Sequence, residues 1–135
     1  TYRQYLERMI ETLNLKDYIK MLGFISSTDL LHVYNAADVT VVPSYSEGSP
    51  LVIPESLACG TPVIATDVGG NAEYLSKVHL GELIVKIEEY DTSNTIYQQL
   101  VKCVESYKLY KKYVEPSKIP SWTNVATEYR EIMRQ

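Results

Sequence analysis

Short apolar runs alternate with longer amphipathic stretches along this chain. The apolar runs cover residues 18–24, 39–42, 62–65 and 82–85, and their starts are spaced by roughly twenty residues. Runs of this length between turn residues are typical of buried strands, and the spacing leaves room for one helix between consecutive strands. We therefore expect four strands in a parallel sheet, joined by helices as βα units.

The amphipathic stretches carry apolar residues at the helical period of 3.6 residues. Besides the helix between strands 39–42 and 62–65, the predicted helices cover residues 2–13, 30–37, 71–76, 92–113 and 122–134. Ser26–Asp29 and Ser121 are the expected caps of the second and the last of these helices. The apolar stripe of the first helix needs a sheet to cover, yet no strand precedes it. We therefore expect the chain to begin within a domain.

The segment 38–70 is the centre of the predicted fold. A strand leads into a loop of small and polar residues that contains Glu47, a helix with Glu55 follows, and Gly60 ends this helix before the next strand. Strand, helix and strand form a βαβ unit. In open α/β sheets, ligands bind in the crevice beyond the carboxyl ends of the strands. We therefore expect a ligand site at the loop that contains Glu47.

Two prolines define where the helix of this unit begins. Proline is tolerated in the first helical turn but not deeper, so Pro50 and Pro54 place the start near Ser49–Leu51. The N–H groups of residues 50–53, apart from those that proline lacks, then have no helical acceptor and lie at the positive end of the helix dipole. Gly48 lets a ligand approach the backbone closely. This pattern predicts an anion site suited to a phosphate or diphosphate.

Two carboxylates flank the predicted anion site. Glu47 lies just before it, and Glu55 lies about one turn inside the helix. A carboxylate repels phosphate, so these side chains are better suited to accept hydrogen bonds from neutral hydroxyls of a ribose or a hexose. A diphosphate between two groups that bind hydroxyls indicates a nucleotide-sugar.

Composition restricts the classes of function. The chain has 135 residues, of which 45% are apolar and 22% charged, as in a globular domain with a core. Its net charge of −4 provides no basic field for nucleic acid. No apolar run approaches the length of a membrane span, and no secretory signal opens the chain. Cys59 and Cys103 have neither the spacing of a metal site nor that of a disulfide framework, so a reducing cytoplasm is expected. His32 and His79 lack the partners of a metal or catalytic site.

The text of residues 47–70 resembles the E-x7-E region of GT-B glycosyltransferases, especially the retaining family 4, also called group 1. The match consists of Glu47 and Glu55 at seven-residue separation, the run ACGTPV at 58–63, and Gly69-Gly70. Similar text continues at residues 22–24, 34–38 and 121–122.

The resemblance implies an α/β fold, with a Rossmann-like parallel sheet flanked by helices, as the C-terminal half of a GT-B enzyme. Residues 1–135 would be a single, partial donor-binding domain. The last helix, 122–134, would pack on this domain or cross to an N-terminal domain outside the chain.

The resemblance also implies roles for individual residues. Glu47 would be the catalytic acid that contacts donor-sugar hydroxyls, and Glu55 would hold the ribose hydroxyls. Other donor-binding positions would act through their backbone: Ile25 on the base, Gly48, Ser49 and Pro50 on the sugar, and Leu51 and Val52 on the diphosphate. Pro50 departs from the family pattern and has no N–H to donate. The alternative is that neither acid binds a ligand, with Glu47 a loop acid that caps neighbouring N–H groups and Glu55 a charge at the helix N-terminus that the dipole favours.

Gly69 and Gly70 leave two interpretations open, because they could line the cleft or make a tight turn.

The implied reaction is retaining transfer of a hexosyl group from a UDP-, GDP- or ADP-sugar, without a metal or other cofactor. The acceptor would be a carbohydrate or a lipid-linked hydroxyl, bound through the N-terminal domain, in the synthesis of a polysaccharide or glycoconjugate. The family's phosphate-binding arginine and lysine have no match here, so we expect the isolated chain to be inactive. The full protein would be cytoplasmic, either free or peripheral at the membrane.

Two alternatives remain open. One is a non-catalytic subunit that binds a nucleotide-sugar. The other is a different GT-B enzyme, such as a sugar-nucleotide epimerase or a phosphorylase.

Overall fold

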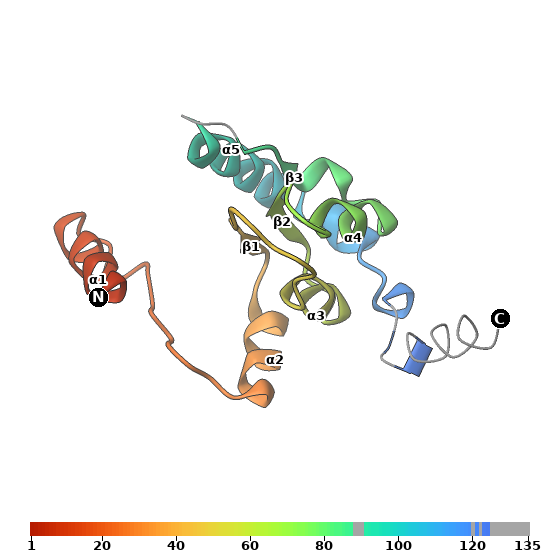
Figure 1. The fold of residues 1–135 in the computed structure, drawn as a ribbon, viewed down its shortest axis with the longest axis horizontal. Coiled ribbons are helices and arrows are strands. Elements are labelled where there is room, and N and C mark those ends of the chain that lie inside the picture. Colours follow the sequence, from red (N-terminus) through yellow and green to blue (C-terminus); the bar gives the residue numbers. More distant parts are fainter. Residues whose placement is uncertain (88–90, 120, 122, 125–135) are drawn as a thin grey trace. The chain divides into compact units, whose positions relative to one another are not determined.

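The computed structural model describes residues 1–87, 91–119, 121 and 123–124 (Figure 1). The chain consists of two compact units, residues 1–30 and residues 31–135. The prediction of one partial domain over residues 1–135 stays a prediction.

The first unit begins with helix α1, Tyr2–Thr12. Its start is fixed by a capping box, in which the Gln4 N–H donates to Thr1 Oγ1 and the backbone nitrogen of Thr1 donates to Gln4 Oε1 at 2.7 Å. The predicted helix over residues 2–13 is confirmed.

The strand predicted at residues 18–24 is wrong. Residues 19–22 have no regular structure, and Gly23 has a φ of +70°, outside the β region. A strand also needs a neighbour for its N–H and C=O groups, and residues 1–30, all of which are described, contain no other extended segment that pairs with it. An apolar run therefore did not suffice to predict a strand.

Helix α2, Ser27–Ala36, begins within the predicted cap Ser26–Asp29 and three residues before the predicted helix 30–37. The Asp29 N–H donates to Ser26 Oγ at 3.1 Å, as expected of a serine before the first helical turn.

The second unit is built on a parallel sheet in the order β1-β2-β3. These strands are β1, Thr40–Val42, β2, Val63–Thr66, and β3, Ile84–Val85. Thr40 pairs with Val63 and Ala65 pairs with Ile84, so β2 is central, and all of its residues are buried. The predicted α/β fold with a parallel sheet is confirmed.

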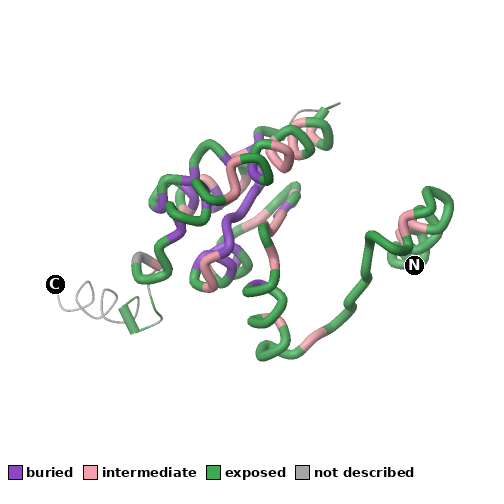
Figure 2. The backbone as a smooth tube through the Cα atoms, turned by 180° about the vertical axis from the view of Figure 1, so that it is seen from behind, coloured by how far each residue is buried: buried purple, intermediate pink, exposed green. Residues whose placement is uncertain are grey.

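Helices cover both faces of this sheet. Helices α3, Val52–Ala58, and α4, Asn71–Lys77, lie on one side, and α5, Thr92–Glu105, lies on the other (Figure 1). The buried residues are concentrated along β2 and on the helices that face it (Figure 2). The core consists of Val42, Ile53, Leu57, Val63, Ile64, Ala65, Leu75, Val78, Leu80, Leu83, Val85, Cys103, Tyr110 and Val114.

The last strand is shorter than predicted. Residues Gly81–Leu83 form a 3₁₀ turn, η1, in which the Leu83 N–H donates to the Leu80 carbonyl at 2.9 Å. That N–H is therefore not available to β2, and only Ile84–Val85 of the predicted strand 82–85 pairs with the sheet. The preceding helix, predicted at 71–76, is confirmed as α4.

The long helix predicted over residues 92–113 is two helices, α5 and α6, Tyr107–Tyr113. Ser106 separates them with φ −107° and ψ 19°, and its carbonyl accepts the Leu109 N–H at 2.8 Å to begin α6. Serine has a low preference for helix interiors. A second 3₁₀ turn, η2, Pro116–Lys118, follows α6.

The last predicted helix, 122–134, falls almost entirely outside the described residues. The described part includes its predicted cap, where the Asn124 N–H donates to Ser121 Oγ at 3.2 Å. Among the helices that the structure describes, none is both long and apolar enough to cross a membrane.

Candidate functional site

Two loops meet beyond the carboxyl ends of the parallel strands. Residues 43–51 join β1 to α3, and residues 67–70 join β2 to α4. The Gly70 N–H donates to the Gly48 carbonyl at 3.2 Å, which joins the two loops through their backbones. Seven of the eight predicted site residues lie on the first loop and on α3. The eighth, Ile25, belongs to the first unit, one residue before the cap of α2.

Gly69 makes the closest contact between these loops. Its φ is +53°, and a Cβ at this position would lie 2.1 Å from the carbonyl oxygen of Glu47 and 2.9 Å from that of Gly48. Real Cβ atoms do not approach an oxygen so closely, and positive φ favours glycine. Of the two interpretations of Gly69, the structure supports a turn, and that turn packs directly against the backbone of Glu47.

A hydrogen bond from Ser44 holds the Glu47 side chain, which is half-buried. Ser44 Oγ donates to Glu47 Oε1 at 2.8 Å. The carbonyl of Ser44 in turn accepts a hydrogen bond of 2.5 Å from Thr66 Oγ1 at the end of β2, and Thr66 is only 2% exposed. Glu47 is therefore connected through Ser44 to the buried central strand.

The start of α3 agrees with the predicted position within one residue. Leu51 is the N-cap, and the Glu55 N–H donates to its carbonyl at 3.0 Å. Pro54 therefore lies in the first turn, where proline is tolerated. Gly48 is exposed, and a Cβ on it would meet nothing within 4 Å, so its backbone is open to a ligand.

Glu55 is exposed on the first turn of α3, and a tyrosine from α2 binds it. Tyr34 donates its hydroxyl to Glu55 Oε2 at 3.1 Å. Burial, the hydrogen bond to Glu55 and the charge of that carboxylate together raise the pKa of Tyr34 to about 12, and burial contributes most.

A buried network fixes α3 to β1 behind Glu55. Ser56 Oγ lies 2.8 Å from Thr40 Oγ1 and 3.0 Å from the Thr61 carbonyl oxygen. Thr61 Oγ1 donates to the Tyr34 carbonyl at 2.7 Å. Helix α3, which carries Glu55, is therefore held by hydrogen bonds to β1 and to the segment that follows the helix.

The sequence interpretation missed Tyr34 and Ser44, which donate to the two carboxylates, and Thr66, which donates to the Ser44 carbonyl. Ser44 is close to Glu47 along the chain, and a serine three residues before an acid is a usable local signal. Tyr34 and Thr66 are distant in sequence from the residues that they contact, so only the fold brings them together.

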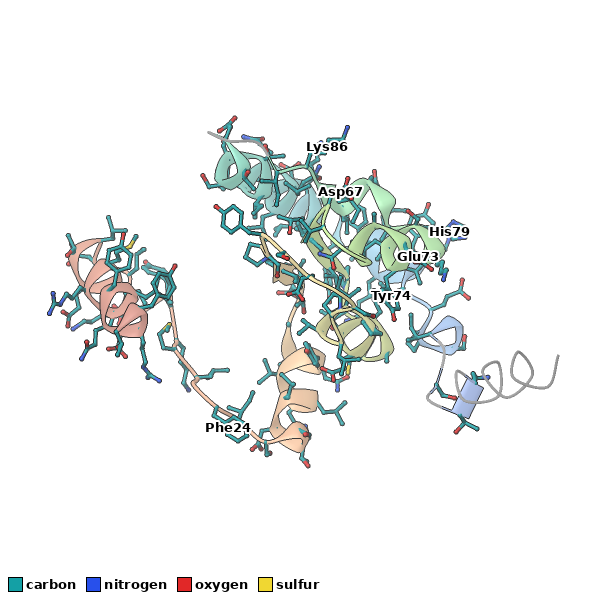
Figure 3. All side chains as sticks on the ribbon, viewed as in Figure 1. Phe24, Asp67, Glu73, Tyr74, His79 and Lys86 are labelled. Atoms are coloured by element: carbon teal, nitrogen blue, oxygen red, sulfur yellow. The ribbon has the colours of Figure 1, made fainter. Side chains whose placement is uncertain are left out.

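Charged side chains also follow the other strands at this edge. Asp67 and Lys86 come directly after β2 and β3, and Figure 3 shows both beside the sheet, with Glu73 and Tyr74 on α4.

Among the described residues, no group of three or more His, Cys, Asp and Glu side chains could hold a metal ion.

The comparisons with known proteins agree on one family. A family model described as "Glycosyl transferases group 1" matches residues 1–116. The D-inositol 3-phosphate glycosyltransferase of Thermobifida fusca is 36% identical over 97 residues, which are 72% of this chain and 22% of that protein. The protein of the same name from Stackebrandtia nassauensis is 30% identical over 125 residues, which are 93% of this chain and 28% of that protein.

A solved structure extends the similarity to the fold. Sucrose-phosphate synthase from Thermosynechococcus elongatus matches with a TM-score of 0.79 and 29% identity, over 99% of this chain and 34% of that chain. The chain thus spans 22% to 28% of the length of the two relatives above. The resemblance carried by residues 47–70 is confirmed, and the chain belongs to the group 1 glycosyltransferases of GT-B fold.

Proposed function

We propose that this chain binds a nucleotide-diphospho-sugar and serves retaining transfer of its hexosyl group to an acceptor hydroxyl. The observation that carries the proposal is the fixed placement of two glutamates around the start of α3. Glu47 is held by Ser44, and Glu55 is held by Tyr34, so each carboxylate has one oxygen occupied by a hydroxyl donor. The remaining oxygens, Glu47 Oε2 and Glu55 Oε1, are those that we assign to the ligand.

We assign the ribose to Glu55 and the donor sugar to Glu47. Both carboxylates accept hydrogen bonds, and sugar hydroxyls donate them. Gly48, Ser49 and Pro50 lie between the two acids, and we assign them backbone contacts with the sugar. The N–H groups of Leu51 and Val52 belong to the start of α3, and we assign them to the diphosphate. The Ile25 backbone is our assignment for the nucleotide base.

We propose that the reaction needs no metal or other cofactor. The acceptor oxygen forms a bond to the anomeric carbon on the face from which the diphosphate departs, the bond from that carbon to the phosphate oxygen breaks, and the acceptor proton goes to the leaving phosphate. The N–H groups at the start of α3 stabilise the charge that develops on the diphosphate. Glu47 orients the sugar for this transfer.

The chain alone does not supply everything that this reaction needs. Two carboxylates beside a diphosphate require cations to offset their repulsion, and we expect these outside the chain, as well as the carbohydrate or lipid-linked acceptor. Since the chain spans about a quarter of the relatives' length, we propose that it is the donor-binding part of a longer cytoplasmic enzyme and transfers no sugar by itself.

Calorimetric titration tests the ribose assignment. UDP, GDP and ADP are titrated into the chain and into the full-length protein that contains it, each as wild type and as Glu55→Ala. We expect the full-length protein to bind one of the nucleotides and Glu55→Ala to weaken that binding about tenfold, which corresponds to roughly 1.4 kcal/mol. Glu73→Ala is the control, because it removes an exposed glutamate that pairs with Lys77 on α4.

Two results would overturn the proposal. One is a full-length protein that binds none of the three nucleotides. The other is a Glu55→Ala variant that binds as tightly as wild type. Nucleotide binding by a full-length protein that transfers no sugar would instead favour the non-catalytic subunit.

A further inference from the structure

We propose that Tyr34 is a positioning residue that sets which oxygen of Glu55 faces the ribose. This inference rests on the proposed function, since it concerns the same nucleotide site. No signal in the sequence connects Tyr34 to Glu55. The connection comes from the hydrogen bond between Tyr34 on α2 and Glu55 on α3.

The geometry separates the two oxygens of Glu55. The hydroxyl of Tyr34 donates its single proton to Oε2 at 3.1 Å. Tyr34 is 6% exposed, whereas Glu55 is exposed, so the hydrogen bond approaches the carboxylate from the protein side. Oε1 is thereby left as the acceptor for hydroxyls that arrive from solvent.

Tyr34 is itself fixed at its backbone. Its carbonyl accepts a 2.7 Å hydrogen bond from Thr61 Oγ1, and Thr61 is 2% exposed just after the end of α3. One end of α3 is therefore tied to the Tyr34 hydroxyl through Glu55, and the segment after its other end is tied to the Tyr34 carbonyl. Tyr34 and α3 keep a constant spacing as a result.

This anchoring matters because Glu55 has rotatable side-chain bonds. An exposed glutamate samples several rotamers, and ordering it for a ligand has an entropic cost. A donor that occupies Oε2 removes most of this freedom before the ligand arrives, so binding is tighter for the same contacts. The advantage applies only to ligands that use Glu55, which are those with ribose hydroxyls.

The test compares Tyr34→Phe with wild type in the full-length protein. The ligands are the nucleoside diphosphate that binds best and its 2′,3′-dideoxy analogue, which lacks both ribose hydroxyls. We expect Tyr34→Phe to weaken the ribonucleotide about 5- to 10-fold and to leave the affinity for the dideoxy analogue unchanged, since a hydrogen bond to a charged group is lost. Equal affinity for the analogue also shows that the variant is folded.

Two further variants complete the experiment. In a Glu55→Ala background, Tyr34→Phe should cause no additional loss, because its effect acts through that carboxylate. Tyr97→Phe is the matched control, since Tyr97 is an exposed tyrosine of α5.

The outcomes separate the two proposals. The ribose assignment fails if Glu55→Ala leaves the preference for the ribonucleotide over the dideoxy analogue intact. It also fails if the wild-type full-length protein binds neither ligand. In both cases the inference about Tyr34 fails with it. If Glu55→Ala abolishes the preference but Tyr34→Phe retains it in full, the ribose assignment stands and the role of Tyr34 is overturned. An equal loss for both ligands in Tyr34→Phe would also overturn it, because the tyrosine would then act only on the fold.

Discussion

Gly69 touches the backbone of Glu47 so closely that a Cβ at position 69 would lie 2.1 Å from the Glu47 carbonyl oxygen. The neighbouring Gly70 donates its N–H to Gly48 at 3.2 Å. The loop after β2 thus packs directly against the loop after β1. The position of Glu47, the candidate catalytic residue, therefore depends on Gly69, which follows a different strand.

Gly69→Ala should destabilise the chain by about 2–5 kcal/mol. Roughly 1–2 kcal/mol comes from placing a Cβ at positive φ, and about 1–3 kcal/mol from the overpacking against Glu47. The matched control is Gly60→Ala, because Gly60 has a φ of +78° but nothing within 4 Å of its added Cβ. Urea unfolding of both variants isolates the clash with the loop. An equal loss of unfolding free energy in the two variants would contradict a clash between the added Cβ and the Glu47 loop.

The hydroxyl of Thr66 should stabilise the loop that contains Glu47. Thr66→Val keeps the shape of the side chain but leaves the Ser44 carbonyl without its 2.5 Å donor. We expect a loss of about 1–2 kcal/mol in urea unfolding. Thr28→Val, at an exposed position of α2, should change stability by less than about 0.5 kcal/mol. A Thr66→Val variant as stable as wild type would show that this hydrogen bond does not hold the loop.

Most of the second unit was predictable because its sequence signals are local. Apolar runs before a loop predicted β1 and β2, and the two prolines predicted the start of α3. The same reasoning failed at residues 18–24, where the apolar run meets a glycine at φ +70°. It also failed at Ser106, whose backbone ends α5 and begins α6. Hydrophobicity indicates burial, but pairing and backbone geometry decide whether a strand or a continuous helix forms.

The candidate site was predictable only in part, for a related reason. The glutamates and the loop between them are adjacent in sequence, so spacing and resemblance could identify them. Ser44, which binds Glu47, lies on the same loop, but Tyr34 comes from α2 and Thr66 from β2. No periodicity connects Tyr34 to Glu55 or Thr66 to Ser44. The roles assigned to the site residues stay predictions.

Ser44→Ala should lower the rate of sugar transfer without destabilising the protein. The variant removes the 2.8 Å hydrogen bond to Glu47 Oε1 but keeps the Ser44 carbonyl that Thr66 holds. If Glu47 orients the donor sugar, kcat of the full-length enzyme should fall about 3- to 10-fold, since tenfold corresponds to roughly 1.4 kcal/mol. The control is Ser46→Ala, at an exposed position of the same loop. Unchanged kcat in Ser44→Ala would argue against an orienting role for this serine.

Tyr34 should make the stability of the fold sensitive to alkaline pH. Its pKa is raised from 10.0 to about 12 in the folded chain, first by burial and then by Glu55. Below pH 10 the tyrosine is protonated in both the folded and the unfolded state. Between pH 10 and 12 the unfolded state loses this proton while the folded state keeps it, so the free energy of unfolding falls as the pH rises. For pKa values of 10 and 12, the loss from this residue is about 1.4 kcal/mol at pH 11.

Tyr34→Phe should therefore remove part of the alkaline destabilisation, because phenylalanine does not ionise. The measurement is urea unfolding between pH 9 and 11, with the difference between variant and wild type followed against pH. Burial also raises the pKa of Tyr110, with Glu82 nearby, so the variant should retain some of the pH dependence. Tyr97→Phe, at an exposed position, should keep all of it. If Tyr34→Phe and wild type lost stability in parallel, the pKa of Tyr34 would be the same in the folded and the unfolded chain, and neither burial nor Glu55 would raise it.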